Sequence, residues 1–215
     1  MTNARETVYI PAKKNPGRLE VICGSMFSGK TEELMRRLRR AEFAKQTVLT
    51  IKHLIDSRAH HQCILSHDGQ ERSAHPIDNT PQGIQKILTL ASHTIDVVGI
   101  DELQFFPKEI IPIISALIEQ GKRVIVSGLD LDFRGEPFGI IPTIMALADS
   151  VTKLNAICSN CGKHSHFSQR IVNGEPARYD DPLMLVGAAE TYEPRCRSCF
   201  IIDKSPNKRT LHETK

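Results

Sequence analysis

Short apolar runs alternate with segments of helical periodicity along most of the chain. The apolar runs predict strands at Leu19–Cys23, Thr47–Ile51, Ile95–Asp101, Arg123–Leu129 and Val151–Ala156. Between them, apolar residues recur every three or four positions, which predicts helices over Thr31–Lys45, Pro81–Ala91, Lys108–Gln120 and Ile141–Asp149. This alternation is typical of an α/β fold with a mainly parallel sheet, whose ligands bind at the carboxyl ends of the strands.

Three segments lack this periodicity. We expect residues 1–17 to form a flexible N-terminal arm and residues 203–215 a disordered C-terminal tail. The polar, His-rich stretch His53–Asp78 predicts a flexible loop with a short hairpin or strand. The remainder divides into an α/β domain over residues 18–150 and a smaller domain over residues 151–202.

The most specific motif lies between the first predicted strand and the first predicted helix. It has the phosphate-binding pattern G-x-x-x-x-G-K-[ST], formed by Gly24, Ser25, Met26, Phe27, Ser28, Gly29, Lys30 and Thr31. The glycines let the backbone point its N–H groups inward, Lys30 supplies a cation for the phosphates, and Thr31 offers a hydroxyl to Mg²⁺. A chance Gly-rich turn is the alternative, which the strand and helix on either side disfavour.

An acidic pair follows the third predicted strand. Asp101 has the place of the acid that reaches the magnesium of a bound nucleotide, and Glu102 is available as a general base. Without the phosphate loop, the pair could equally belong to an ordinary surface turn. Two phenylalanines, Phe105 and Phe106, come next, either as a stacking wall for a flat ligand or as core residues, and the sequence leaves both readings open.

Four of the six cysteines form two C-x-x-C pairs, Cys158/Cys161 and Cys196/Cys199. This spacing indicates a structural zinc site, because four thiolates leave no ligand position open for water. Four free thiols or two disulfides are the alternatives, and His164 and His166 lie close enough in sequence to compete as ligands.

Composition narrows the function classes. The chain has 215 residues with 28 basic and 25 acidic side chains, a balance too even to indicate a nucleic-acid or membrane partner. We see no export signal or membrane span and expect a cytoplasmic protein. The arginines at positions 36, 37, 39 and 40 indicate a solvated helix face or a subunit contact rather than a nucleic-acid stripe. The rival class is an ATPase or helicase-like module that holds nucleic acid with its zinc element; the short chain and the lack of a second ATP-binding domain disfavour it.

Taken together, these motifs closely resemble the cellular-type (type II) thymidine kinases in their bacterial form. The resemblance covers Arg18 to Phe200 and rests on GSMFSGKT, IDSRA, SHDG, DELQFF, GLDLDFRGEPFG, the paired C-x-x-C motifs and VGAAETYEPRCRSCF. It implies a RecA-like P-loop domain followed by a small zinc-binding lasso domain, where the lasso is the long loop between the two C-x-x-C pairs. It also implies transfer of the γ-phosphate of ATP to the 5′-hydroxyl of thymidine, which yields dTMP and ADP.

The same resemblance implies the site residues. It assigns ATP with Mg²⁺ to Gly24–Thr31, Asp101 and Gln104, makes Glu102 the catalytic base, and matches Asp56 and Arg58 to a D-x-R element that contacts the nucleotide or its metal. The thymine pocket would comprise Met26, Phe105, Phe133, Leu183, Met184, Leu185, Val186, Gly187 and Tyr192. A homotetramer with dTTP as feedback inhibitor is implied as well.

Small departures from the family pattern concern the pocket. Ala188 stands where many relatives have a second glycine, and Ser168 where many have threonine. Ala188 restricts the backbone at that step, so both positions bear on the selection of thymidine over deoxyuridine.

Overall fold

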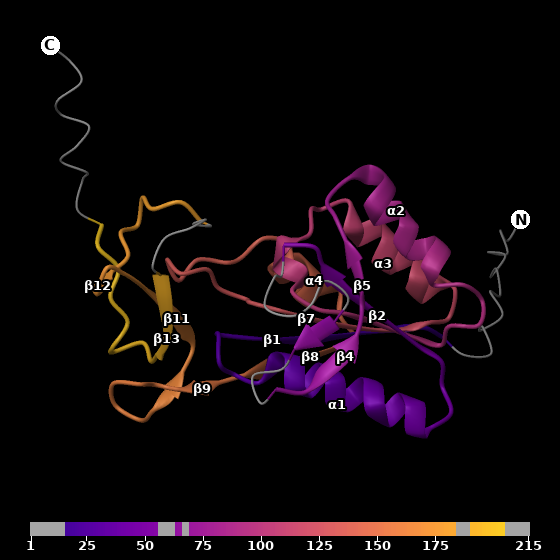
Figure 1. Cartoon of the computed structure of the whole chain (residues 1–215), viewed down its shortest axis with the longest axis horizontal. Coiled ribbons are helices and arrows are strands. Elements are labelled where there is room, and N and C mark those ends of the chain that lie inside the picture. The colour runs from indigo at the N-terminus through magenta and orange to yellow at the C-terminus, as the bar shows by residue number, and fades with distance from the viewer. Residues whose placement is uncertain (1–15, 56–62, 66–68, 184–189, 205–215) are drawn as a thin grey trace, which may run out of the picture.

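The computed structural model describes residues 16–55, 63–65, 69–183 and 190–204. Two lobes lie side by side in Figure 1. The large lobe contains the central sheet and its helices, and the small lobe contains the strands from β9 onward.

The central sheet has six strands in the order β5-β2-β6-β7-β1-β8, and all its pairings are parallel. The strands are β1 (Arg18–Gly24), β2 (Val48–His53), β5 (His75–Ile77), β6 (Val97–Ile100), β7 (Arg123–Gly128) and β8 (Ser150–Leu154). The predicted α/β class is therefore confirmed. Since β7 lies between β1 and β6, the phosphate loop and the acidic pair both lie beside the end of β7.

Helices cover both faces of the sheet (Figure 1). They are α1 (Lys30–Phe43), α2 (Pro81–Leu90), α3 (Ile110–Glu119) and α4 (Ile141–Leu147), with a short 3₁₀ helix, η1 (Leu103–Phe105). Side chains on β1 alternate between two cores, because Val21 and Cys23 pack with α2, α3 and α4 whereas Ile22 packs with α1. Burial on both faces explains why the strands appear in the sequence as unbroken apolar runs.

The last predicted strand, Val151–Ala156, was wrong as a single element. β8 ends at Leu154, and a separate strand, β9 (Ala156–Ile157), begins the small lobe. Because β8 pairs with β1, residues 151–154 belong to the central sheet although the sequence analysis assigned them to the second domain. The division of the chain into domains otherwise stays a prediction.

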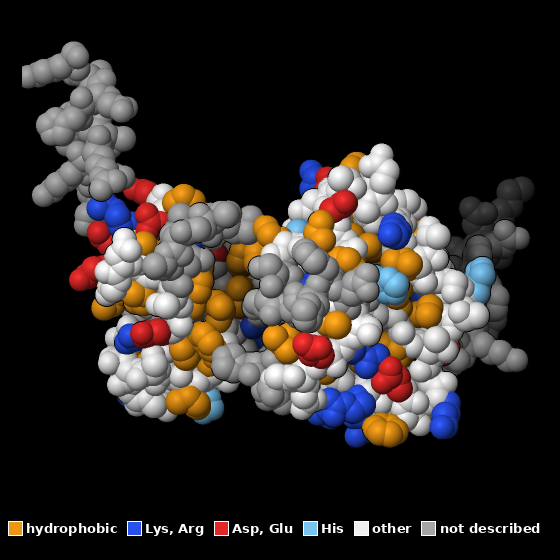
Figure 2. Space-filling view, viewed as in Figure 1, with side chains coloured by type: hydrophobic (Ala, Val, Ile, Leu, Met, Phe, Trp, Pro, Cys, Tyr) orange, Lys and Arg blue, Asp and Glu red, His pale blue; other side chains and the backbone are white. Residues whose placement is uncertain are grey.

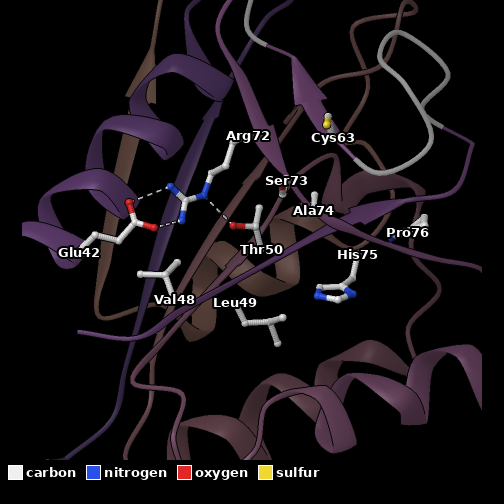
Figure 3. A pocket seen from close by; sticks show the side chains of 10 residues that line it. All are labelled: Glu42, Val48, Leu49, Thr50, Cys63, Arg72, Ser73, Ala74, His75 and Pro76. Atoms are coloured by element: carbon white, nitrogen blue, oxygen red, sulfur yellow. Dashed lines mark hydrogen bonds and ion pairs between the residues drawn. The ribbon is translucent and has the colours of Figure 1, made fainter. Parts of the chain in front are cut away.

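The His-rich stretch after β2 contains both elements that the sequence offered as alternatives. Strands β3 (Cys63–Leu65) and β4 (Glu71–Ser73) form an antiparallel hairpin, and β5 then joins the edge of the central sheet. A cavity of about 630 Å³ lies between this hairpin and the sheet. Figure 3 shows Arg72 crossing it to reach Glu42 on α1 and Thr50 on β2.

The small lobe consists of short antiparallel strands. β9 pairs with β10 (His164–Ser165), and β11 (Phe167–Val172) lies between β12 (Glu175–Pro176) and β13 (Glu190–Arg195). The chain end also contributes, because Asp203 forms a bridge with Arg178. Asp203 is thus part of this lobe rather than of a disordered tail; residues 205–215 lie outside the described chain.

The arginines of α1 divide into two groups. Arg36, Arg39 and Arg40 are exposed, as the solvated-face reading predicts, and Figure 2 shows Lys and Arg side chains gathered over α1 at the lower edge of the large lobe. Arg37 differs because it is half-buried and donates to Glu20 on β1 at 2.9 Å and to Thr152 on β8 at 2.8 Å. It therefore ties α1 to two strands of the sheet. Among the helices in the described part of the chain, none has the length and hydropathy of a transmembrane span.

Glu33 on α1 generates a pH-dependent prediction. Hydrogen bonds from Arg36 (2.6 and 2.8 Å), aided by Arg37 and opposed by partial burial, lower the pKa of Glu33 from 4.5 to about 2. A lowered folded-state pKa stabilises the protein above the unfolded-state pKa, and this contribution is lost as the pH falls from about 4.5 through about 2.

We therefore expect Glu33→Gln to flatten the fall in the free energy of unfolding between pH 5 and 3, measured by urea denaturation at roughly 0.5-unit steps. Glu109→Gln is the matched control, because Glu109 is exposed and no ion pair to it is found among the described residues. Parallel pH profiles for wild type and Glu33→Gln would contradict the prediction.

Candidate functional site

The phosphate loop begins at the end of β1 and ends in the first turn of α1. Gly24 has φ of +146°, and a Cβ on it would lie 2.3 Å from the carbonyl oxygen of Leu154 on β8. Gly29 caps α1 with φ of +81°. Both positions need glycine, since side chains are strained or excluded there. The loop can therefore aim its amides and the positive end of α1 at an anion.

The side chains of Lys30 and Ser25 in this loop fit a bound phosphate. Lys30 is 8% exposed and its Nζ donates to the carbonyl of Ser25 at 2.7 Å, so the cation is folded into the loop. The hydroxyl of Ser25 is buried and makes no hydrogen bond with any residue that the structure describes. A buried, orphaned hydroxyl is costly unless a ligand uses it, which suits a bound phosphate oxygen.

Asp101 connects the loop with the neighbouring strands. It directly follows β6, is 2% exposed, and accepts a hydrogen bond from the hydroxyl of Thr31 at 3.1 Å through Oδ2. Its Oδ1 accepts from the amide of Glu102 at 3.0 Å and from the hydroxyl of Ser127 on β7. Thr31 and Asp101 thus place two hard oxygen donors together, and such oxygens are the ligands that Mg²⁺ prefers.

Glu102 lies one residue further on, in a left-handed conformation with φ of +54°. This conformation is uncommon for a non-glycine residue, and it turns the chain sharply between β6 and η1. The carboxylate of Glu102 accepts a hydrogen bond from the side-chain amide of Gln104. The other end of that amide accepts from the backbone N–H of Leu129 at 3.0 Å. Gln104 therefore holds the acid against the end of β7.

The two phenylalanines of the same segment have different environments. Phe106 is 3% exposed and belongs to the core, whereas Phe105 is half-buried. The ring of Phe105 lies 6.0 Å from those of His53 and Phe138. The core reading holds for Phe106, and the stacking-wall reading stays open for Phe105.

The small lobe contacts the phosphate loop directly. The hydroxyl of Ser168 on β11 accepts a hydrogen bond from the amide of Met26 at 2.9 Å. On the same strand, Arg170 is fully buried, with its guanidinium 4.3 Å from the ring centroid of Phe133 and 6.0 Å from that of Tyr192. Arg170 also donates to the carbonyl of Pro182 at 2.7 Å, one residue before Leu183. These contacts join Phe133, Tyr192 and the start of the expected base-binding segment.

The four cysteines meet in the small lobe, where one pair follows β9 and the other follows β13. The sulfurs of Cys158, Cys161, Cys196 and Cys199 all lie within 4.8 Å of one another, and those of Cys161 and Cys196 are 3.6 Å apart. A tetrahedral zinc with Zn–S bonds of about 2.3 Å separates its sulfurs by about 3.8 Å, so the cluster fits zinc. Burial raises the pKa of Cys158, but backbone hydrogen bonds at Cys196, Asn160 and Cys161 outweigh it and lower that pKa to about 6. At Cys161 the backbone hydrogen bond at Lys163 lowers the pKa, but hydrogen bonds with the other three cysteines and burial outweigh it and raise that pKa to about 11. Cys158 therefore favours the thiolate, the form that binds metal, and Cys161 the thiol.

Comparison with known proteins identifies the family. Residues 17–200 match the family described as "Thymidine kinase". The chain belongs to the thymidine kinase family. A thymidine kinase of Coprothermobacter proteolyticus is 57% identical over 180 residues, which cover 84% of this chain and 88% of that protein.

Two of the solved structures that resemble this thymidine kinase family member have low sequence identity to it. The genome-packaging NTPase B204 of Sulfolobus turreted icosahedral virus 2, in complex with AMP, aligns with a TM-score of 0.46 and 14% identity over 68% of this chain and 79% of that one. AMPPCP-bound DnaA from Aquifex aeolicus aligns with a TM-score of 0.39 and 15% identity over 66% of this chain and 40% of that one. The family assignment rests on the sequence matches alone.

Several expected site residues of this family member lie outside the described chain. They are Asp56, Arg58, Met184, Leu185, Val186 and Gly187. Conversely, the sequence analysis did not identify the roles of Ser127 and Arg170. A fully buried arginine inside a strand is rare, and its position in a short alternating segment gave no signal that it would lie against Phe133.

Gln104 provides a test of the geometry around the acids. Gln104→Met removes both hydrogen bonds of a side chain that is 4% exposed, which leaves the amide of Leu129 and one oxygen of Glu102 without these partners. We expect a loss of roughly 1–3 kcal/mol in the free energy of unfolding, measured by urea denaturation. Gln82→Met at an exposed position of α2 is the control and should change stability by no more than about 0.5 kcal/mol. Equal effects of the two variants would show that Gln104 does not hold the acids.

Proposed function

We propose that this thymidine kinase family member transfers the γ-phosphate of ATP to the 5′-hydroxyl of thymidine. The observation that supports it most is the meeting of Lys30, Thr31, Asp101 and Glu102 at the carboxyl ends of β1 and β6, the two parallel strands on either side of β7. Such a site holds phosphates, a divalent cation and a general base within one hydrogen-bonded unit. These are the parts that phosphoryl transfer requires.

Each part of the unit has a role in the proposed reaction. The amides of the loop other than that of Met26, which donates to Ser168, and the Nζ of Lys30 would bind the phosphates. Thr31 and Asp101 would hold Mg²⁺, which would neutralise developing charge on the phosphate oxygens. Glu102 orients the attacking hydroxyl and accepts its proton. Gln104 keeps the carboxylate of Glu102 in place through Leu129 and so positions the base. Its expected contact with the nucleotide remains part of the proposal.

The nucleoside would bind between the two lobes. Met26 and Phe133 are joined to β11 through Ser168 and Arg170, and Tyr192 pairs with Arg170 on the neighbouring strand. Phe105 lies on the large lobe, beside the acidic pair. Together with Leu183 and the segment 184–187, these residues are our proposed thymine pocket. Asp56 and Arg58 complete the proposed nucleotide contacts.

The four-cysteine cluster is our proposed structural zinc site. With four thiolates the ion would have no open position, so its role is to hold the ends of the lasso together rather than to catalyse. The family resemblance further supports a cytoplasmic homotetramer inhibited by dTTP, without nucleic-acid or membrane partners. These last properties are part of the proposal.

The test of the proposed function is a panel of thymidine, deoxyuridine, deoxycytidine and deoxyadenosine, incubated with ATP, Mg²⁺ and the purified protein. We expect dTMP from thymidine and little product from deoxycytidine or deoxyadenosine.

Glu102→Gln should lower turnover by roughly 10²- to 10⁴-fold while ATP affinity is kept, because the loop and Lys30 are unchanged. Normal turnover by this variant would show that Glu102 is not the general base. No product from any nucleoside, with ATP hydrolysis stimulated by DNA, would favour the helicase-like class instead.

Removal of zinc tests the role of the small lobe. We expect a strong chelator to abolish thymidine binding, measured by calorimetry, before it unfolds the large lobe. The reason is that the metal contributes directly to the folding of the segment between its ligands. Far-UV circular dichroism should show the α/β core largely retained. Unchanged thymidine affinity in metal-free protein would contradict this role.

A further inference from the structure

We infer that Ser127 is a positioning residue that orients the carboxylate of Asp101 for magnesium. The inference rests on the proposed function, in which Thr31 and Asp101 hold that ion. Ser127 is the residue before the end of β7, and β7 pairs with β6 in parallel register up to Ile100 and Val126. The next residues are Asp101, directly after β6, and Ser127 on β7. They therefore lie side by side, which explains why their side chains meet.

The hydrogen bonds around Asp101 distinguish its two oxygens. Oδ1 accepts from the hydroxyl of Ser127 and from the amide of Glu102, so two donors occupy its two lone pairs. Oδ2 lies instead against the hydroxyl of Thr31, at 3.1 Å. Since the terminal torsion of an aspartate is soft, these donors determine which oxygen is presented to a cation beside Thr31.

Ser127 acts through Asp101 rather than on a ligand. Its side chain is fully buried, with 0% exposure, so it has no surface to offer to a nucleotide or nucleoside. The second donor to Oδ1 is a backbone amide and persists whatever residue stands at position 127. A substitution of Ser127 therefore isolates the contribution of one hydroxyl to the orientation of the carboxylate.

Partners that orient a metal ligand affect metal affinity by roughly 10- to 100-fold. Because the amide of Glu102 remains, we expect the lower end for Ser127→Ala: about 10-fold weaker binding of Mn²⁺ to the protein–ADP complex, measured by electron paramagnetic resonance of free Mn²⁺. Ser127→Thr keeps the hydroxyl and should restore affinity to within about 2-fold. In the thymidine assay, Ser127→Ala should need about 10-fold more Mg²⁺ for half-maximal rate, with the KM for thymidine changed by less than about 2-fold.

Ser165→Ala is the matched control. Ser165 is also a serine with 0% exposure in a strand, and its hydroxyl donates to the carbonyl of Arg195 at 2.9 Å, far from Asp101 in the small lobe. This variant should lose some thermal stability with no change in Mn²⁺ affinity. Unchanged Mn²⁺ affinity in Ser127→Ala would overturn the inference, as would equal weakening in Ser165→Ala. The Mn²⁺ measurement contains no nucleoside, so its result remains interpretable if the nucleoside panel fails.

Discussion

The carboxylate of Asp101 is the point on which the site depends. It lies at the end of β6, accepts from Thr31 at the start of α1, and accepts from Ser127 near the end of β7. A buried carboxylate is tolerated only when its oxygens are hydrogen-bonded. Separating β6, β7 and the start of α1 would leave Asp101 unsatisfied, and the free-energy cost of this keeps the three segments together. The parallel order β6-β7-β1 makes this possible, because it brings three carboxyl ends to one edge.

The two lobes supply different parts of the proposed site at this edge of the sheet. The large lobe supplies the phosphate loop and both acids, all on or beside strands that are buried on both faces. The small lobe supplies Ser168 and Arg170 on β11 and the aromatic side chain of Tyr192 on β13, built on short antiparallel strands. In the proposed reaction, the catalytic groups would thus lie on the more extensively packed large lobe and contacts to the nucleoside on the small lobe.

Sequence reasoning succeeded for the buried strands, because their apolar runs are a local signal, and the structure brings together the four cysteines of the C-x-x-C pairs. The phosphate loop and the acidic pair are also local patterns, and their roles stay predictions. It offered a short strand within His53–Asp78 but did not locate it or its partner, and it missed contacts that depend on residues distant in sequence. β5 is three residues long, contains Pro76 and joins the sheet by backbone pairing to β2, so its side chains carried no pattern. The contacts of Ser127, Gln104 and Arg170 depend on side chains brought close by the fold, and a single sequence does not show which strands are neighbours.

The hydrogen bond from the amide of Met26 to Ser168 has a thermodynamic consequence. One amide of the phosphate loop thus donates to a side chain of the small lobe, so an anion in the loop could use this amide only by replacing Ser168. Binding free energies at coupled sites are reciprocal. A ligand that draws this amide away from Ser168 destabilises the contact between the small lobe and the loop. By the same free energy, that contact weakens the binding of the ligand. A ligand that leaves the bond intact binds to the large lobe without that opposition.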